Sequence, residues 1–190
     1  MDYYQDEMKK KELREKYKNL RAELSNADLE KISEKISSNL LSEFILNEKK
    51  ISVFIPISKF NEVNTWLIID KVKADFYLPV IGENDQLKQI HFEGKHQLKQ
   101  NDWGILEPQF GNEIDAAEID IVLVPLLTID NNGYRVGYGK GYYDKFLARC
   151  KKECLFVGLY QFDTIEEIDD LNEFDIPLHY CITPARVIRF

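Results

Sequence analysis

The 190-residue sequence carries 33 acidic and 25 basic side chains, a net charge of −8 and a pI of about 5.0. Hydrophobic residues make up 44% of the chain, enough for a sizeable core, which excludes a disordered or fibrous protein. The length favours a single domain spanning residues 1–190. Because an acidic surface repels phosphate backbones, nucleic-acid binding is disfavoured, and any anionic ligand needs a local cluster of positive groups.

Three cysteines, Cys150, Cys154 and Cys181, are too few for a disulfide framework. The first two are spaced like half of a metal site, but the histidines show no ligand spacing, so reduced thiols are favoured. The charged N-terminus has no signal-peptide core, and no apolar run approaches the ~18 residues of a membrane helix. We therefore expect a cytoplasmic protein without membrane contact, and nothing in the sequence demands more than a monomer.

Hydrophobic periodicity predicts two N-terminal helices. The first spans residues 5–24, with Leu13, Tyr17 and Leu20 on one face. Ser25 and Asp28 resemble a capping box that starts the second helix, which should end near Asn47. Further helical patterns cover residues 61–73 and 142–151, with a short helix at 164–168.

Short apolar runs predict buried strands at residues 51–57, 76–80, 119–125 and 155–159, and a final strand at 182–190. The turn-rich segment 81–110 predicts a small hairpin insertion with irregular coil that folds over a site. Strands that alternate with helices predict a three-layer α/β/α fold with a mainly parallel central sheet. Ligands of such sheets bind beyond the carboxyl ends of the strands.

The segment Asp130–Asp144 reads DNNGYRVGYGKGYYD and is the strongest candidate for a binding site. Its three alternating glycines, Gly137, Gly139 and Gly141, let the backbone approach a ligand, and successive amides can form an anion-binding concavity. A helix that begins near Tyr142 would point its positive end at the same place.

Charged side chains in this segment suit a nucleotide. Arg135 and Lys140 add positive charge, and Asp144 suits the magnesium that accompanies nucleotide phosphates. The P-loop pattern fails at Tyr134 and Gly141, and the dinucleotide and calcium-loop patterns fail as well. The alternative is a tight strand-to-helix turn whose glycines only relieve backbone strain, but such a turn needs fewer glycines and no lysine between them.

Other candidates lie far from this segment in the sequence. Lys10 and Arg14 share one helix face, with Arg21 close to it, although most such pairs are only solvated charge. Glu62 follows the first strand, where a carboxylate could meet a ligand. Trp103 could stack on a flat ring or pack under a loop. Asp175 ends an acidic run and could complete a magnesium site.

Together these motifs resemble the 5-formyltetrahydrofolate cyclo-ligase family over nearly the whole chain. The segment Gly133–Asp144 looks like the family's nucleotide and folate loop, and Lys10–Arg14 is similar to its Lys-x-x-x-Arg start. Glu62–Thr65 resembles its Glu-x-x-Thr contact, and Trp103–Pro108 its Gly-Ile-x-Glu-Pro stretch. Phe174 departs from the His or Asn that often precedes the family's aspartate, so the match around Asp175 is incomplete.

The resemblance implies conversion of 5-formyltetrahydrofolate to 5,10-methenyltetrahydrofolate with ATP and Mg²⁺, releasing ADP and phosphate by way of a phosphorylated formyl group. It implies a catalytic Lys140 and metal ligands Asp144 and Asp175. The implied ATP-binding residues are Lys10, Arg14, Arg135, Val136, Gly137, Tyr138, Gly139, Lys140, Gly141, Tyr142 and Tyr143. The implied substrate-binding residues are Arg14, Glu62, Trp103, Tyr138, Gly139, Lys140, Gly141 and Tyr142.

Two other functions stay open. The same loop could serve a non-catalytic module that senses folate or nucleotide, which would bind its ligand without producing ADP. A similar layered fold could also act on sugar phosphates or acyl thioesters. That reaction needs its own base or nucleophile, and no isolated Glu or Cys in a suitable context stands out.

Overall fold

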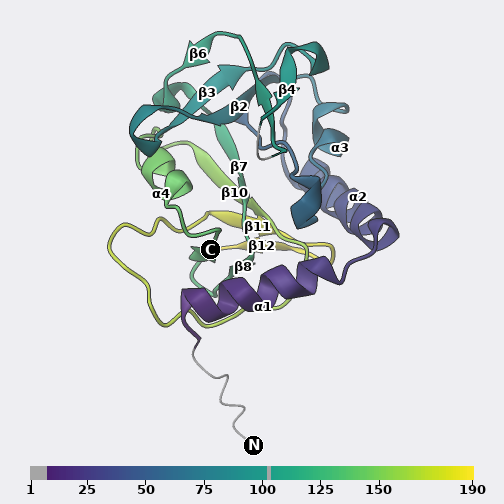
Figure 1. Ribbon diagram of the computed structural model, residues 1–190, viewed down its shortest axis with the longest axis vertical. Coiled ribbons are helices and arrows are strands. Elements are labelled where there is room, and N and C mark those ends of the chain that lie inside the picture. The colour runs from purple at the N-terminus through teal and green to yellow at the C-terminus, as the bar shows by residue number, and fades with distance from the viewer. Residues whose placement is uncertain (1–7, 102–103) are drawn as a thin grey trace, which may run out of the picture.

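The computed structural model describes residues 8–101 and 104–190. Within them, a central sheet has the strand order β12-β11-β10-β7-β1-β2-β3-β6 (Figure 1). Its middle strands run parallel: β11 (Tyr180–Ile182), β10 (Leu155–Leu159), β7 (Ile121–Pro125), β1 (Lys50–Ser52) and β2 (Asp75–Ile81). The edge strands are antiparallel: β12 (Val187–Arg189), β3 (Leu87–His91) and β6 (Glu113–Ile114). The predicted mainly parallel sheet is confirmed.

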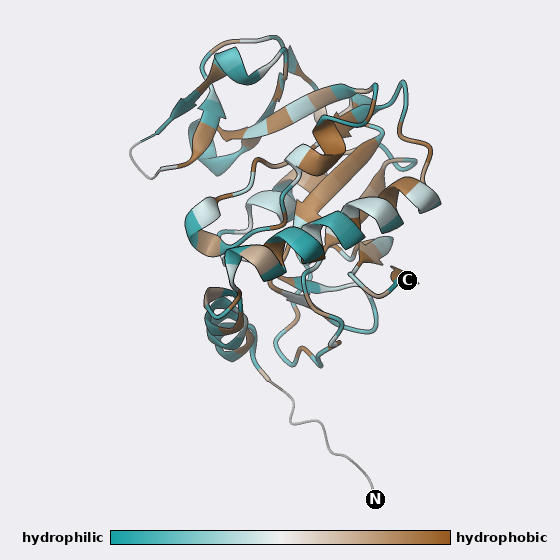
Figure 2. Cartoon of the chain, turned by 90° about the vertical axis from the view of Figure 1, so that its right-hand side faces the viewer, coloured by the Kyte–Doolittle hydropathy of each residue, from teal (hydrophilic) through white to brown (hydrophobic). Residues whose placement is uncertain are grey.

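Side chains of β7 alternate between two hydrophobic cores, as the two-residue period of a strand requires. Val122 and Val124 pack with α1 (Lys10–Ala22) and α4 (Tyr142–Leu147) on one face. Ile121 and Leu123 pack with α2 (Asn26–Glu43) and α3 (Trp66–Ile69) on the other. Helices therefore cover both faces, which confirms the three layers, and Figure 2 shows the hydrophobic strands between more hydrophilic helices.

The two predicted N-terminal helices form but are shorter than predicted: α1 begins at Lys10 and ends at Ala22, and α2 ends at Glu43 instead of near Asn47. Residues 5–7 of the first predicted helix lie outside the described residues. Leu13, Tyr17 and Arg21, spaced four residues apart, are the buried residues of α1. Ser25 caps α2, because its hydroxyl accepts a hydrogen bond of 3.2 Å from the amide of Asp28. No helix in the described ranges is long and apolar enough to cross a membrane.

Three further predicted helices were too long or wrong. Only Trp66–Ile69 is α-helical in the predicted segment 61–73, and the left-handed conformation of Asn61 prevents a helix from beginning at that residue. The helix α4 ends at Leu147 instead of residue 151. Residues 164–168 form no helix, because the Glu166 amide bonds to the carbonyl of Ile129 and holds this segment against β8 (Thr128–Ile129).

Two strand predictions also change. The predicted strand 51–57 is shorter in the structure, where β1 covers Lys50–Ser52. Pro56, which has no amide hydrogen to donate, lies beyond its end. The predicted strand 182–190 is not continuous: residue 182 ends β11, residues 183–186 form the connection, and Val187–Arg189 form β12, which pairs antiparallel with β11.

Small hairpins lie outside the central sheet. One joins β4 (Leu98–Gln100) to β5 (Leu106–Pro108), inside the segment where a hairpin is predicted. The other joins β8 (Thr128–Ile129) to β9 (Arg135–Val136) and was not predicted. Asp130 builds its turn by accepting 2.8 Å hydrogen bonds from the amides of Asn132 and Tyr134. The glycine segment therefore follows this hairpin, and not β7 directly.

Candidate active site

Residues 137–141, here called the glycine loop, connect β9 to α4. Gly139 has φ +89° and Gly141 has φ +68°, a region that residues with a Cβ rarely adopt. Gly137 is not among the positive-φ residues, and a Cβ there would meet nothing within 4 Å. Two of the three glycines are thus required by backbone conformation.

The helix α1 lies against the glycine loop. Arg14 donates a hydrogen bond of 2.9 Å from Nε to the carbonyl of Gly137. A Cβ on Gly139 would lie only 3.0 Å from Cζ of the same guanidinium. A shallow depression of about 250 Å³ runs along the exposed face of α1 beside this contact, lined by Lys11, Arg14, Glu15, Lys18 and Asn19. Arg14 therefore contacts the loop as predicted, and the mostly positive surface of α1 lies next to the glycine loop.

A buried chain of hydrogen bonds connects α1, the loop and Glu62. The Tyr138 hydroxyl donates to Glu62 Oε1 at 2.8 Å and accepts from Arg21 Nη1 at 3.1 Å. Glu62 Oε2 accepts from the amide of Ile57 at 2.9 Å. Arg21 also donates to the carbonyl of Leu126. Arg21 is 3% exposed and Glu62 is 5% exposed, so both charges are removed from solvent.

The protonation of this chain follows from burial. Burial raises the pKa of Glu62, whereas the hydrogen bonds from Ile57 and Tyr138 and the charge of Arg21 act to lower it. Burial also raises the pKa of Tyr138 well above its ordinary value, with the charge of Glu62 adding to the effect, so its hydroxyl stays protonated. A protonated phenol between a guanidinium and a carboxylate accepts from the first and donates to the second.

The two predicted metal ligands come together near the starts of α1 and α4, and each is paired with a cation. Asp144 Oδ1 accepts from Arg135 Nη2 at 2.9 Å and from the amide of Ile176 at 3.2 Å. Asp175 Oδ2 forms an ion pair with Lys10. Arg135 also donates to the carbonyl of Ile176 at 2.6 Å, which fixes the segment carrying Asp175 beside α4.

These aspartates fit a magnesium site of the kind that relies on phosphates. Across residues 8–101 and 104–190, no group of three or more His, Cys, Asp or Glu could hold a metal ion. Magnesium at nucleotide sites usually takes one or two carboxylates and completes its shell with phosphate oxygens and water. Asp144 Oδ2 and Asp175 Oδ1 lie outside the hydrogen bonds described above. The pair could therefore supply oxygen ligands without a third protein carboxylate.

The remaining predicted site residues differ in how far they are exposed to solvent. Lys140 is exposed and makes no hydrogen bond or ion pair within the described part of the chain. Val136 is 1% exposed, so only its backbone could reach a ligand. Tyr142 and Tyr143 are partly buried against the core at the start of α4. Trp103 lies outside the described residues. Cys150, Cys154 and Cys181 are free thiols.

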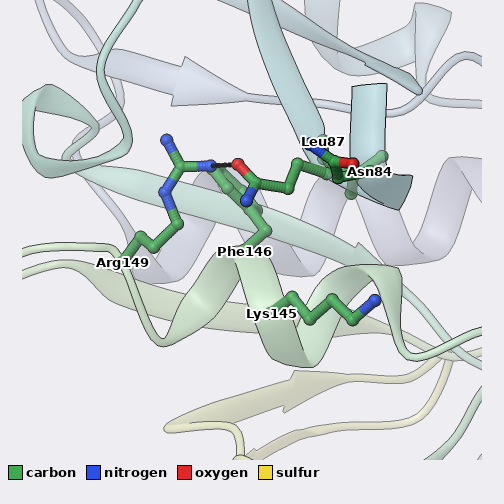
Figure 3. A pocket seen from close by; sticks show the side chains of 6 residues that line it. Asn84, Leu87, Lys145, Phe146 and Arg149 are labelled. Atoms are coloured by element: carbon green, nitrogen blue, oxygen red, sulfur yellow. Dashed lines mark hydrogen bonds between the residues drawn. The ribbon is translucent and has the colours of Figure 1, made fainter. Parts of the chain in front are cut away.

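A separate cavity of about 200 Å³ lies between α4 and the turn that connects β2 to β3 (Figure 3). Arg149 donates a 3.2 Å hydrogen bond to Gln86 at its edge, as Figure 3 shows. Its lining residues are Asn84, Gln86, Leu87, Lys145, Phe146 and Arg149. None of the predicted site residues lines this cavity, and the Lys145 and Arg149 side chains extend in different directions.

Arg21 was predicted to lie near the helix face of Lys10 and Arg14, without a role in the site. The available signal was its spacing, because Arg14 and Arg21 are seven residues apart, or about two helical turns. The hairpin before the glycine loop also had a signal, since Asn132-Gly133 is a typical hairpin turn pair.

Comparison with known proteins identifies close matches over the whole fold. The profile of the 5-formyltetrahydrofolate cyclo-ligase family matches residues 6–184. The 5-formyltetrahydrofolate cyclo-ligase of Mycoplasma genitalium is 29% identical over 170 residues, which cover 85% of this chain and 90% of that protein. The Haemophilus influenzae protein of the same name is 27% identical over 179 residues, covering 90% and 95%.

Solved structures agree. The NMR structure of Aquifex aeolicus 5,10-methenyltetrahydrofolate synthetase aligns with a TM-score of 0.80 and 31% identity, covering 96% of this chain and 93% of that one. A 5,10-methenyltetrahydrofolate synthetase from Mycoplasma pneumoniae shares the fold at a TM-score of 0.70 and 22% identity, covering 93% and 99%. Because the family profile spans almost the entire chain, this protein belongs to the 5-formyltetrahydrofolate cyclo-ligase family, a family of ligases.

Proposed function

We propose that this protein converts 5-formyltetrahydrofolate to 5,10-methenyltetrahydrofolate and couples the reaction to cleavage of ATP to ADP and phosphate, with Mg²⁺. Family membership supports this proposal. The single observation that carries it is the contact of Arg14 with Gly137 and Gly139, because it unites the two motifs expected to hold the triphosphate in one place.

The proposed chemistry has two steps. The formyl oxygen attacks the γ-phosphorus of ATP, so that ADP leaves and the formyl oxygen carries a phosphoryl group. Nitrogen N10 then attacks the formyl carbon, the C–O bond breaks, and phosphate departs with that oxygen while N10 loses its proton. The product is the methenyl cation, with one ADP and one phosphate for each ring closed.

Positive charge around the glycine loop suits the first step. Phosphoryl transfer depends on positioning and on stabilising charge spread over the transferred oxygens. Lys140 is our candidate for this stabilisation, since it is exposed and has no other partner among the described residues. Lys10, Arg14 and the backbone of the Arg135–Tyr143 run would hold the ATP phosphates, and Asp144 with Asp175 would hold magnesium against them.

Folate would lie next to the same loop. Tyr138, Gly139–Tyr142, Arg14 and Trp103 are our candidates for contact with it. Glu62 would accept hydrogen bonds from N–H groups of the reduced pterin ring. An ionised carboxylate has about four acceptor sites, and Ile57 and Tyr138 occupy two of those on Glu62.

The test is the growth of the methenyl product's absorbance when protein, 5-formyltetrahydrofolate, ATP and magnesium are mixed. We expect product only when all four are present. Absence of product from well-folded protein, with the stability of the methenyl compound controlled, would exclude the proposed activity. Tight binding by calorimetry without ADP production would instead favour the non-catalytic binding module.

A further inference from the structure

We propose that Arg21 is a positioning residue that orients Tyr138 against Glu62 and thereby fixes the glycine loop for ligand binding. It contacts no ligand itself, because its side chain is 3% exposed beneath the loop. This role deepens the proposed function. Only the expected change in KM rests on that function, and the expected change in hydrogen exchange does not.

The helix α1 holds two successive residues of the loop. Arg14 bonds to the carbonyl of Gly137, and Arg21, seven residues later, bonds to the side chain of Tyr138. The guanidinium of Arg21 also donates to Leu126, just beyond the end of β7. One side chain thus connects the helix, the central sheet and the loop, and a planar guanidinium with several fixed donors suits this task better than an ammonium.

Burial of the Arg21 guanidinium costs free energy, because the charge is removed from water. A buried cation without a partner is strongly unfavourable. The nearest carboxylate on this path is Glu62, and the Tyr138 hydroxyl lies between the two charges, hydrogen-bonded to both. Breaking either hydrogen bond would leave a buried charged group with one partner fewer. The Tyr138 hydroxyl is therefore held in the one orientation that keeps both bonds.

Other contacts of Tyr138 hold its ring but not its hydroxyl. Phe60 lies 5.3 Å from the ring between centroids, and the ammonium of Lys18 lies 5.7 Å above it. The side-chain amide of Asn61, next to Glu62, donates to the backbone carbonyl of Arg21 at 2.7 Å, a contact that substitution of the Arg21 side chain leaves in place. Only the guanidinium of Arg21 and the carboxylate of Glu62 therefore orient the Tyr138 hydroxyl among the contacts of the described residues.

Hydrogen exchange at the two ends of the loop tests the proposal without any assay of activity, because the amide of Leu127 donates to the carbonyl of Val136 at 2.8 Å and the amide of Lys145 donates to that of Gly141 at 3.2 Å. We expect Arg21→Lys and Tyr138→Phe each to speed exchange of these two amides by about tenfold, the scale of losing a charge-assisted hydrogen bond. Exchange in α2, on the far face of the sheet, should stay unchanged. Arg149→Met, which removes an exposed guanidinium at the separate cavity, is the matched control and should leave the loop unchanged.

The double variant Arg21→Lys/Tyr138→Phe separates positioning from bulk stability. If Arg21 acts through Tyr138, the second substitution adds little to the first. Additive effects, or faster exchange across the whole protein, would overturn the proposal. Arg21→Met removes the charge altogether, and should it fail to fold, Arg21→Lys and Tyr138→Phe still decide.

Kinetics give the second readout. In an active enzyme, Arg21→Lys should raise KM for 5-formyltetrahydrofolate about tenfold with a smaller change in kcat, because the loop is no longer preorganised. A fall in the amount of folded enzyme alone, with KM unchanged, would contradict positioning. Wild-type protein without methenyl product would refute the proposed function, while the exchange experiment would still decide the role of Arg21.

Discussion

Nε of Arg14 lies 2.9 Å from the carbonyl oxygen of Gly137, although 123 residues separate the two in sequence. Through this hydrogen bond the first helix contacts the glycine loop in the candidate site. The contact is close enough that the guanidinium would meet any side chain on Gly139. The predictions below follow from this arrangement and from the groups around it.

Gly139→Ala should destabilise the protein by about 1–3 kcal/mol, since it places a Cβ at φ +89° and 3.0 Å from Arg14. Gly137→Ala is the matched control, with open space at its Cβ and no positive φ, and should change the free energy of unfolding by less than about 1 kcal/mol. Urea denaturation measures both. Equal losses in the two variants would show that the Arg14 contact does not constrain Gly139.

Lys140→Ala should lower kcat on the order of 10²–10³-fold, as expected when a charge aimed at the transition state is removed. Its melting temperature should change little, because the side chain is exposed. Lys145→Ala removes another exposed lysine five residues along the chain, on α4, and should keep normal turnover. Initial rates with saturating ATP give the comparison, and near-normal kcat in Lys140→Ala would remove Lys140 from the mechanism.

Asp144→Asn should raise the magnesium concentration needed for half-maximal rate. The same change weakens the ion pair with Arg135, whose side chain is 5% exposed, so a lower melting temperature should accompany it. Asp169→Asn, in the neighbouring acidic run, is the control for a general loss of negative charge. A magnesium dependence equal to that of wild type would count against Asp144 as a ligand.

Protein stability should fall as the pH drops below about 6.5, in part because of His179. Its Nδ1 accepts a hydrogen bond from the amide of Phe156 at 3.0 Å, and burial lowers its pKa. The unfolded chain then takes up a proton at a pH where the folded protein does not, and the balance shifts towards unfolding.

His179→Asn keeps an acceptor near Nδ1 but does not titrate. Its melting temperature should therefore depend less on pH between 5 and 7 than that of wild type. The difference in melting temperature should be modest, since burial of His179 is only partial and solvent still reaches the residue. An identical pH dependence in both proteins would show that His179 does not contribute.

The sequence predicted the sheet well where burial is strongest. Residues 121–125 and 155–159 form β7 and β10 because both faces of these strands are covered, which selects continuous apolar runs. The predicted helix 61–73 is shortened to Trp66–Ile69 and the predicted helix 164–168 is absent, because tertiary contacts overrode helical spacing. Asn61 turns left-handed and bonds to α1, and Glu166 is held by Tyr17 and Ile129.

The candidate site was only partly predictable. Motif spacing identified Arg14, Glu62 and the glycine loop, and the structure brings these three together. The role of Arg21 could not be read from spacing, because a buried arginine on a helix looks like any charged residue until its partners are known. The ion pairs of Asp144 and Asp175 likewise depend on how residues 172–176 return to α1 and α4.

Whether one site couples ATP cleavage to ring closure is decided by measuring ADP and methenyltetrahydrofolate in the same reaction. We expect equal amounts of both products at every time point, and neither product when ATP or 5-formyltetrahydrofolate is omitted. Methenyltetrahydrofolate formed without ATP, or ADP released without ring closure, would contradict this coupling.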